Sequence, residues 1–209
     1  MKKIHLLTLA VFTLFISSTA FAQTQKGNIM VGASLGNITG TFSDGSDKFQ
    51  ININPKVGWF IKDNLALGVD VNLGYAHTSF DNDSKLNDFN YGIGAFGRYY
   101  ISDKSIEFSK RSRFFFEANA GFAGTNSKTK TPGGASSSSN TNGLALGFGP
   151  GLAYFITPNV GLEALLKYDV TVGFGSSTTV QRLGLNVGFQ IYLPSKRAKE
   201  LLRAEQQGK

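Results

Sequence analysis

The sequence contains no cysteine and only two histidines among its 209 residues. Without cysteine there is no disulfide framework and no thiolate metal site. One of the two histidines is His5, in the extreme N-terminal segment, so a histidine-rich metal centre is excluded as well. After that segment, no stretch approaches the roughly 18 continuous apolar residues of a transmembrane helix. We expect no metal, no cofactor and no helical membrane span in the body of the chain.

A glycine pattern at 92–97 matches the spacing of a dinucleotide-binding loop, Gly-x-Gly-x-x-Gly. That loop functions only between a strand and the helix that follows it. Here the pattern lies within a single expected strand and no helix follows, so the cofactor expectation stays at none.

Residues 1–22 have the three parts of a secretory signal peptide. Two lysines follow the first methionine, an apolar stretch covers 4–16, and Ala20-Phe-Ala22 provides the small-residue cleavage motif. Cleavage is expected between Ala22 and Gln23. The two lysines account for two of the formal charge of +7, which leaves +5 for the rest of the chain.

Residues 182–193 alternate between apolar and polar or small side chains over twelve positions. This period of two is typical of a strand with one face on lipid and the other on a polar interior, and the run is long for a soluble strand. Seven earlier runs show the same alternation: 29–36, 49–59, 65–76, 89–101, 114–124, 143–156 and 160–171.

Eight strands are the smallest even number found in bacterial outer-membrane barrels. The segments 39–48, 77–88 and 125–142 are polar and long, whereas 62–64 and 157–159 are tight turns. Long loops face outward and short turns face the periplasm in such barrels, with the inner connection 102–113 as an exception. The sequence predicts an all-β fold, an eight-stranded antiparallel up-and-down transmembrane β-barrel with a polar, filled lumen.

A soluble lipocalin-type barrel is the structural alternative. Its water-facing surface would carry many lysines and glutamates, but the small-and-polar face here is mostly glycine, alanine and asparagine. We therefore expect a barrel domain over 23–193 with its apolar residues outside. Residues 194–209 change character and predict a short, basic, helical periplasmic tail, which together with 102–113 accounts for the positive charge.

Aromatic residues gather near both ends of the runs and predict two interfacial girdles. The inner set is Trp59, Phe60, Tyr99, Tyr100, Phe114, Phe115, Phe116, Tyr154, Phe155 and Tyr192. The outer set is Phe49, Tyr75, Phe89, Tyr91, Phe122 and Tyr168.

The inward face carries four cationic and four anionic side chains, which predict a charge network in the lumen. They are Lys56, Arg98, Lys167 and Arg182 with Asp70, Glu117, Glu163 and Asp169. In an antiparallel hairpin, opposing residues have a constant index sum. Symmetry about each connection therefore pairs Lys56 with Asp70, Arg98 with Glu117, and Asp169 with Arg182. Such pairing favours a polar plug over an ion path, because unpaired charge in an enclosed space is costly.

The end of the last run, Asn186-Val-Gly-Phe-Gln-Ile-Tyr-Leu193, reads polar-x-Gly-x-x-apolar-x-apolar. This pattern resembles the closing-strand signal that the barrel assembly machinery recognises, with Asn186, Gly188, Ile191 and Leu193 as its marked positions. With the eight runs, the chain resembles the outer-membrane protein β-barrel domain family, small barrels similar to the OmpA transmembrane domain and OmpX. The resemblance implies fold and location in the outer membrane of a diderm bacterium, and little about activity.

His77 and Ser79 face lipid by parity at the outer end of their strand. A lipid-facing His-x-Ser is similar to the base and nucleophile of lipid A deacylases, but the expected acid position falls on Tyr91. We therefore expect no catalytic residues, with this pair as the remaining enzymatic hypothesis.

The function expected is that of a non-enzymatic outer-membrane barrel in envelope structure, surface interaction or adhesion. A small-solute channel is the first alternative, and a lipid A deacylase-like hydrolase is the second. The partners expected are outer-membrane lipids, the assembly machinery during biogenesis, and an extracellular ligand of the loops 39–48, 77–88 and 125–142. The basic composition does not indicate nucleic acid in this setting.

Overall fold

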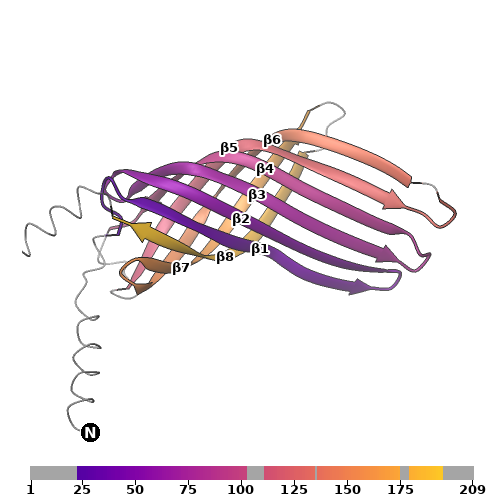
Figure 1. The fold of residues 1–209 in the computed structure, drawn as a ribbon, viewed down its shortest axis with the longest axis horizontal. Helices are drawn as coiled ribbons and strands as arrows, with labels where there is room; N and C mark the ends of the chain where they lie inside the picture. Colours follow the sequence, from indigo (N-terminus) through magenta and orange to yellow (C-terminus); the bar gives the residue numbers. More distant parts are fainter. Residues whose placement is uncertain (1–22, 103–110, 135, 175–178, 195–209) are drawn as a thin grey trace, which may run out of the picture.

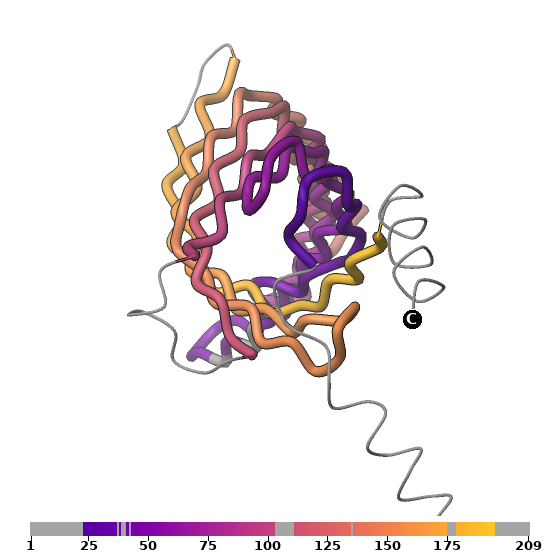
Figure 2. Tube along the Cα trace, turned by 90° about the vertical axis from the view of Figure 1, so that its left-hand side faces the viewer, coloured from indigo at the N-terminus to yellow at the C-terminus, as the bar shows by residue number. Residues whose placement is uncertain are grey.

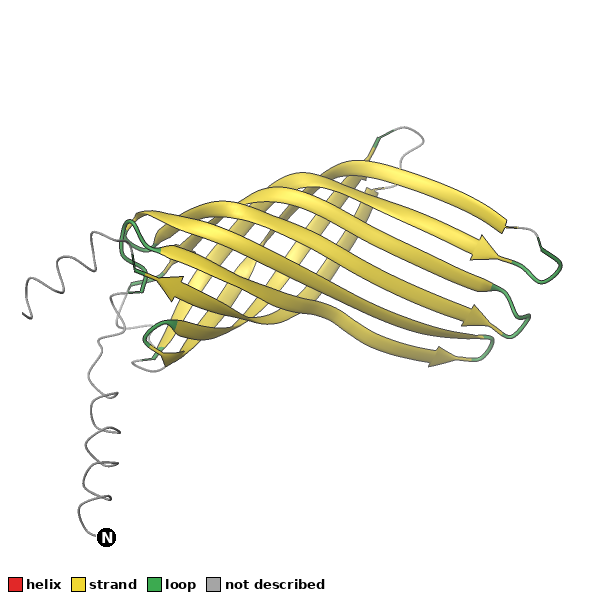
Figure 3. Cartoon of the chain, viewed as in Figure 1, coloured by secondary structure: helices red, strands yellow, loops and turns green. Residues whose placement is uncertain are grey.

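The computed structural model describes residues 23–102, 111–134, 136–174 and 179–194. The predicted signal peptide, 1–22, lies outside the described residues, as does the predicted basic tail apart from Pro194. Within the described ranges the regular structure is strand throughout (Figure 3). No helix in this part of the chain is long and apolar enough to cross a membrane.

Eight antiparallel strands follow one another around a closed barrel, each paired with its neighbours in sequence order and β8 with β1 (Figures 1 and 2). They are β1 (Ile29–Ser43), β2 (Ser46–Lys62), β3 (Leu65–Phe80), β4 (Lys85–Tyr100), β5 (Ser112–Lys130), β6 (Ser136–Thr157), β7 (Val160–Gly173) and β8 (Thr179–Leu193). Seven of the eight predicted runs lie within these strands, and the run 89–101 ends one residue beyond β4.

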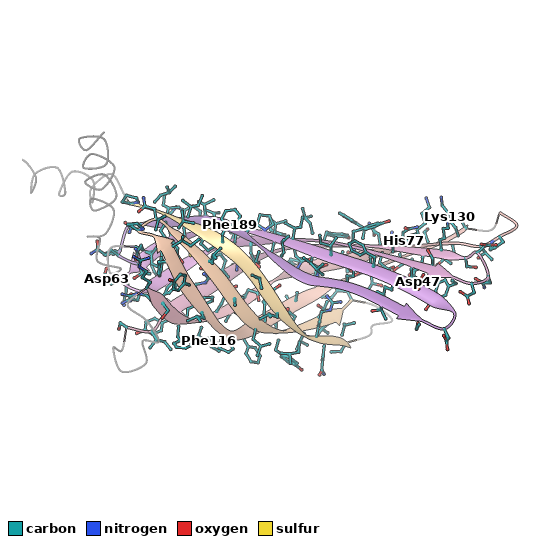
Figure 4. The ribbon with its side chains drawn as sticks, turned by 90° about the horizontal axis from the view of Figure 1, so that it is seen from below. Asp47, Asp63, His77, Phe116, Lys130 and Phe189 are labelled. Carbon is teal, nitrogen blue, oxygen red and sulfur yellow. The ribbon has the colours of Figure 1, made fainter. Side chains whose placement is uncertain are left out.

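Alternation places large apolar side chains on the outside of the barrel. Phe116 on β5 and Phe189 on β8, both labelled in Figure 4, are each 47% exposed. The alternate positions point inward, where Glu117 is 1% and Gln190 is 0% exposed. An apolar exterior around a polar and aromatic interior is the reverse of a soluble barrel, and it fits a barrel surrounded by lipid.

The three segments predicted as long polar loops are not loops. Most of each belongs to a strand: β1 and β2 are joined at 44–45, β3 and β4 at 81–84, and β5 runs to Lys130. Apolar alternation stops where a strand leaves lipid, because both of its faces then meet water. Pairing to the neighbouring strand continues, since backbone hydrogen bonds need no apolar side chains.

Six strands, β1 to β6, project farther than β7 and β8 (Figures 1 and 4). Pairing of β1 with β8 ends at Gly36↔Asn186, next to a register shift between Gly36 and Thr39. Pairing of β6 with β7 begins at Gly143↔Gly173, although β6 starts at Ser136. The projecting end is therefore an open six-stranded sheet on a closed barrel.

Candidate functional site

The lumen charges come from facing positions on adjacent strands. The register pairs Lys56 with Asp70 on β2 and β3, and Arg98 with Glu117 on β4 and β5. Asp169 on β7 lies opposite Arg182 on β8. These three backbone pairings are those that the index sums predicted, because each hairpin keeps one constant sum through the charged positions.

Of the three facing pairs, Arg98 and Glu117 alone also contact each other through their side chains. Glu117 accepts hydrogen bonds from Arg98 Nε at 2.8 Å and from Lys56 Nζ at 2.7 Å. Arg98 also donates to Glu163 Oε1 at 2.6 Å. The predicted Lys56–Asp70 ion pair is replaced by Lys56–Glu117, which spans the lumen from β2 to β5.

The outermost predicted pair is replaced as well. Lys167 Nζ lies 3.0 Å from Asp169 Oδ1, on the same strand, while the opposing Arg182 is exposed. Asp169 therefore pairs with a cation two residues away on its own strand and not with the residue across the hairpin. The network of Lys56, Arg98, Glu117 and Glu163 is buried. Asp70 is buried as well, but it accepts a hydrogen bond from Asn119 and not from Lys56.

The inner end of the lumen is filled by aromatic rings, and this corrects the predicted inner girdle. Alternate members of that set point inward and are almost completely buried: Phe60, Tyr100, Phe115, Phe155 and Tyr192. Of the other members, Trp59, Tyr99, Phe116 and Tyr154 face outward and are 46–50% exposed, and Phe114 is half-buried. The alternation in the sequence could have predicted this division. Phe60, Tyr100 and Phe155 each directly follow an outward-facing aromatic residue and must therefore point inward.

Polar contacts join the aromatic cluster to the charge network. The hydroxyls of Tyr100 and Tyr192 lie 2.7 Å apart, and Tyr192 donates to Glu163 Oε1 at 2.9 Å. The Arg98 guanidinium stacks 4.0 Å from the centre of the Phe115 ring. A side chain at Gly151 would collide with that ring, so this glycine makes room for Phe115. Rings, guanidinium and carboxylates thus form one packed layer.

A cavity of about 330 Å³ lies on the outer side of this layer. Asparagines and charged groups dominate its polar lining, with Asn52, Asp70 and Asn119 among them. One side-chain oxygen of each of these three has no hydrogen-bond donor in the described part of the chain. Such a polar, roomy space fits ordered water. Among the described residues no cluster of side chains is suited to hold a metal ion.

The structure brings His77 and Ser79 together at the outer rim of β3. Ser79 Oγ lies 3.1 Å from His77 Nε2, and His77 Nδ1 lies 2.7 Å from Asn87 Oδ1 on β4. Asn87 Oδ1 also accepts a hydrogen bond from Tyr75 at 3.0 Å. An amide oxygen can only accept, so His77 donates through Nδ1 and leaves Nε2 to accept from Ser79. The sequence placed the expected acid position at Tyr91 and did not reveal Asn87, which lies opposite His77 in the register.

The four residues of the closing-strand pattern lie on β8, at the barrel seam with β1. Asn186 and Gly188 face inward, opposite Gly36 and Ser34 of β1. Ile191 and Leu193 face outward and are 37% and 45% exposed. Their place on the strand that closes the barrel fits the predicted role, which stays a prediction.

Comparisons with known proteins agree with this geometry. Residues 62–198 match the family model described as outer membrane protein beta-barrel domain. No match was found among curated protein sequences.

Two solved structures illustrate the shared fold. Neisserial surface protein A (NspA) is 23% identical, with 79% of this chain and 99% of that chain covered and a TM-score of 0.53. Ail, the attachment invasion locus protein of Yersinia pestis, in complex with the heparin analogue sucrose octasulfate, is 12% identical. Its alignment covers 81% of this chain and all of Ail, with a TM-score of 0.53.

Proposed function

Because this chain belongs to the outer membrane protein beta-barrel domain family, we propose that it is a non-enzymatic outer-membrane barrel that acts in surface interaction or adhesion. A plugged barrel anchors the protein, and the open sheet of β1 to β6 projects outside the membrane to bind partners. The observation that carries this proposal is the edge of β6 at residues 136–141, which within the described part of the chain is not paired with β7. We refer to it as the free edge of β6.

The proposed location is the outer membrane of a diderm bacterium, reached after cleavage behind Ala22 and insertion by the barrel assembly machinery through β8. In this orientation the turns at 63–64 and 158–159 face the periplasm, with the basic tail on the same side. Outer-membrane lipids surround the apolar exterior. Nucleic acid is not among the proposed partners.

A free strand edge is a template for another strand, and proteins usually protect such edges with charge or proline. The β6 edge is Ser-Ser-Ser-Ser-Asn-Thr, without either. Its short polar side chains leave the backbone accessible to an extended segment of a partner protein, as in strand addition. The name of Ail, an attachment protein with this fold, agrees with an adhesive role.

The packed inner layer argues against the channel alternative. Arg98, Tyr100, Phe115 and Tyr192 are each 1% exposed or less, and they come from three strands around the lumen. An eight-stranded barrel is just wide enough for side chains to fill it. We propose that this layer closes the lumen as a mixed aromatic and charged plug.

Trimming the projecting hairpin tests the adhesive role. Residues 126–140 are replaced by Asn-Gly, so that β5 and β6 end close to the level of β7. Cells displaying the wild-type protein should adhere to host cells more strongly than cells lacking the protein, and cells displaying the trimmed barrel should not. A control that trims the β1–β2 hairpin to the same level should keep adhesion. Equal adhesion of wild-type and trimmed cells, with both barrels folded, would refute the role of this edge.

A second candidate function, lipid acyl-ester hydrolysis, is favoured by the hydrogen-bonded relay Ser79–His77–Asn87. Serine, histidine and an orienting group are the elements of an activated nucleophile. However, β3 is paired on both sides of Ser79, so its backbone N–H serves the sheet and is not free to stabilise an oxyanion. A fluorophosphonate probe that labels the wild type but neither Ser79→Ala nor His77→Ala would favour the hydrolase. Absence of labelling in all three supports the non-enzymatic function.

A further inference from the structure

Three lysines share the outward face of the projecting sheet. Lys85 on β4 lies directly opposite Lys130 on β5, and Lys128 is the next outward residue of β5, opposite Asn87. All three side chains are exposed. We refer to Lys85, Lys128 and Lys130 as the lysine cluster. Figure 4 places Lys130 at the projecting end, together with His77 and far from Asp63 in the inner turn.

Within the described part of the chain, no ion pair joins the lysine cluster to an acidic side chain, Asp81 and Asp83 of the adjoining turn 81–84 included. Asp88 is at an inward position of β4. Asp47 faces outward on β2, but β3 separates it from Lys85, about 10 Å away at the usual strand spacing. Like charges directly opposite one another destabilise a sheet. An anion that binds here relieves this repulsion.

The side chains around the cluster can donate hydrogen bonds. Ser136 and Ser138 on β6 lie opposite Lys130 and Lys128. Their hydroxyls are on the same outward face as the ammonium groups. Ammonium and hydroxyl donors are suited to the several acceptor oxygens of a phosphate group.

The cluster lies just above the outer aromatic residues. Phe89 and Tyr91 stack on the outward face of β4 with ring centres 6.3 Å apart. Lys85 is four residues from Phe89 toward the projecting end of β4, about 13 Å along the strand at the usual rise per residue. For a typical strand tilt this corresponds to about 10 Å along the membrane normal. Aromatic girdles mark the interface, and lysine side chains extend toward the nearest polar layer. The ammonium groups therefore reach the head-group region.

From these observations we infer that the lysine cluster binds the phosphate of an anionic lipid head group in the outer leaflet. The inference rests on the outward orientation proposed above for the projecting sheet. Lipid head groups are present at this height around the whole barrel, and the outward face of β4 and β5 is the face turned toward them. The cluster anchors the projecting sheet to the membrane surface and so sets its height and tilt.

Lipid binding can be measured by native mass spectrometry on the folded protein in a neutral detergent. The probes are phosphatidic acid, phosphatidylcholine with the same acyl chains, and inorganic phosphate as a competitor. The variant is Lys85→Gln/Lys128→Gln/Lys130→Gln. The matched control, Lys26→Gln/Lys48→Gln/Lys62→Gln, removes three exposed lysines outside the cluster. A gel shift between boiled and unboiled samples verifies that each barrel is folded.

The wild type and the control should bind phosphatidic acid more tightly than phosphatidylcholine. The cluster variant should lose affinity for phosphatidic acid on the order of 100-fold, as expected for three surface lysines. Equal binding of the two lipids, or an equal loss in the control, would overturn the inference. If inorganic phosphate displaces phosphatidic acid with an affinity equal to that of the lipid, the ligand is a free anion and the inference of a lipid ligand is refuted. The readout does not depend on adhesion or orientation, so its failure is distinguishable from failure of the proposed function.

Discussion

Replacing Arg98 by methionine would test the plug most directly. Arg98 is 1% exposed and pairs with both Glu117 and Glu163 at 2.6 Å. In the variant, Glu117 keeps the cation Lys56 as its partner, whereas Glu163 keeps the neutral hydroxyl of Tyr192. Removing one partner of a buried ion pair costs about 3–5 kcal/mol, because a charge remains buried without compensation.

A second substitution identifies the cause of this loss. In Arg98→Met/Glu163→Gln the orphaned carboxylate is replaced by a neutral amide that still accepts from Tyr192. We expect the double variant to recover at least half of the lost stability, since neutral groups of similar volume often replace a buried pair without penalty. Arg182→Met is the matched control and should cost less than about 1 kcal/mol, because Arg182 is exposed.

The free energy of unfolding is measured by urea titration of the barrel in lipid vesicles. Trp59 is the single tryptophan, and its side chain is 48% exposed on the outward face. Its emission therefore changes when the strand leaves lipid and enters water. The reasoning is wrong if Arg98→Met lies within about 1 kcal/mol of the wild type, or if the double variant is no more stable than the single one.

Three further outcomes are expected. Ile191→Asp/Leu193→Asp places charge on the lipid face of the closing strand. The variant should therefore remain in the periplasm and be sensitive to protease. A normally inserted barrel would contradict the role of β8. An epitope inserted at residues 132–134, the turn between β5 and β6, should bind antibody on intact cells, whereas binding only after permeabilisation would reverse the orientation. In planar bilayers the wild type should not conduct ions, whereas Phe115→Gly/Tyr192→Gly should show steady conductance. The control, which changes the outward residues Phe116→Gly/Phe189→Gly, should not conduct. Conductance in the wild type would refute the plug.

Local pattern was sufficient for the barrel and for its hairpins. Period two marks each membrane crossing, because lipid requires an apolar side chain at every second position. Register within a hairpin follows from the turn, and for this reason Arg98 and Glu117 could be paired before the fold was known. The ends of the strands were not predictable in this way, since outside lipid the pairing of 125–130 with 136–141 continues without an apolar pattern.

Contacts across the lumen depended on closure of the barrel. Lys56 and Glu117 are 61 positions apart on strands that are not neighbours, and the curvature of the closed sheet brings them together. Closure of the barrel also brings the hydroxyls of Tyr100 on β4 and Tyr192 on β8 into contact. Asn87 completes the relay with His77 only through the β3–β4 register.

The sequence by itself determined the membrane-crossing strands, their inward and outward faces and the register of the hairpins, because these depend on neighbours along one hairpin. The tertiary structure decided the ion-pair partners, the plug and the free edge of β6, because these depend on how eight strands close and where each one stops.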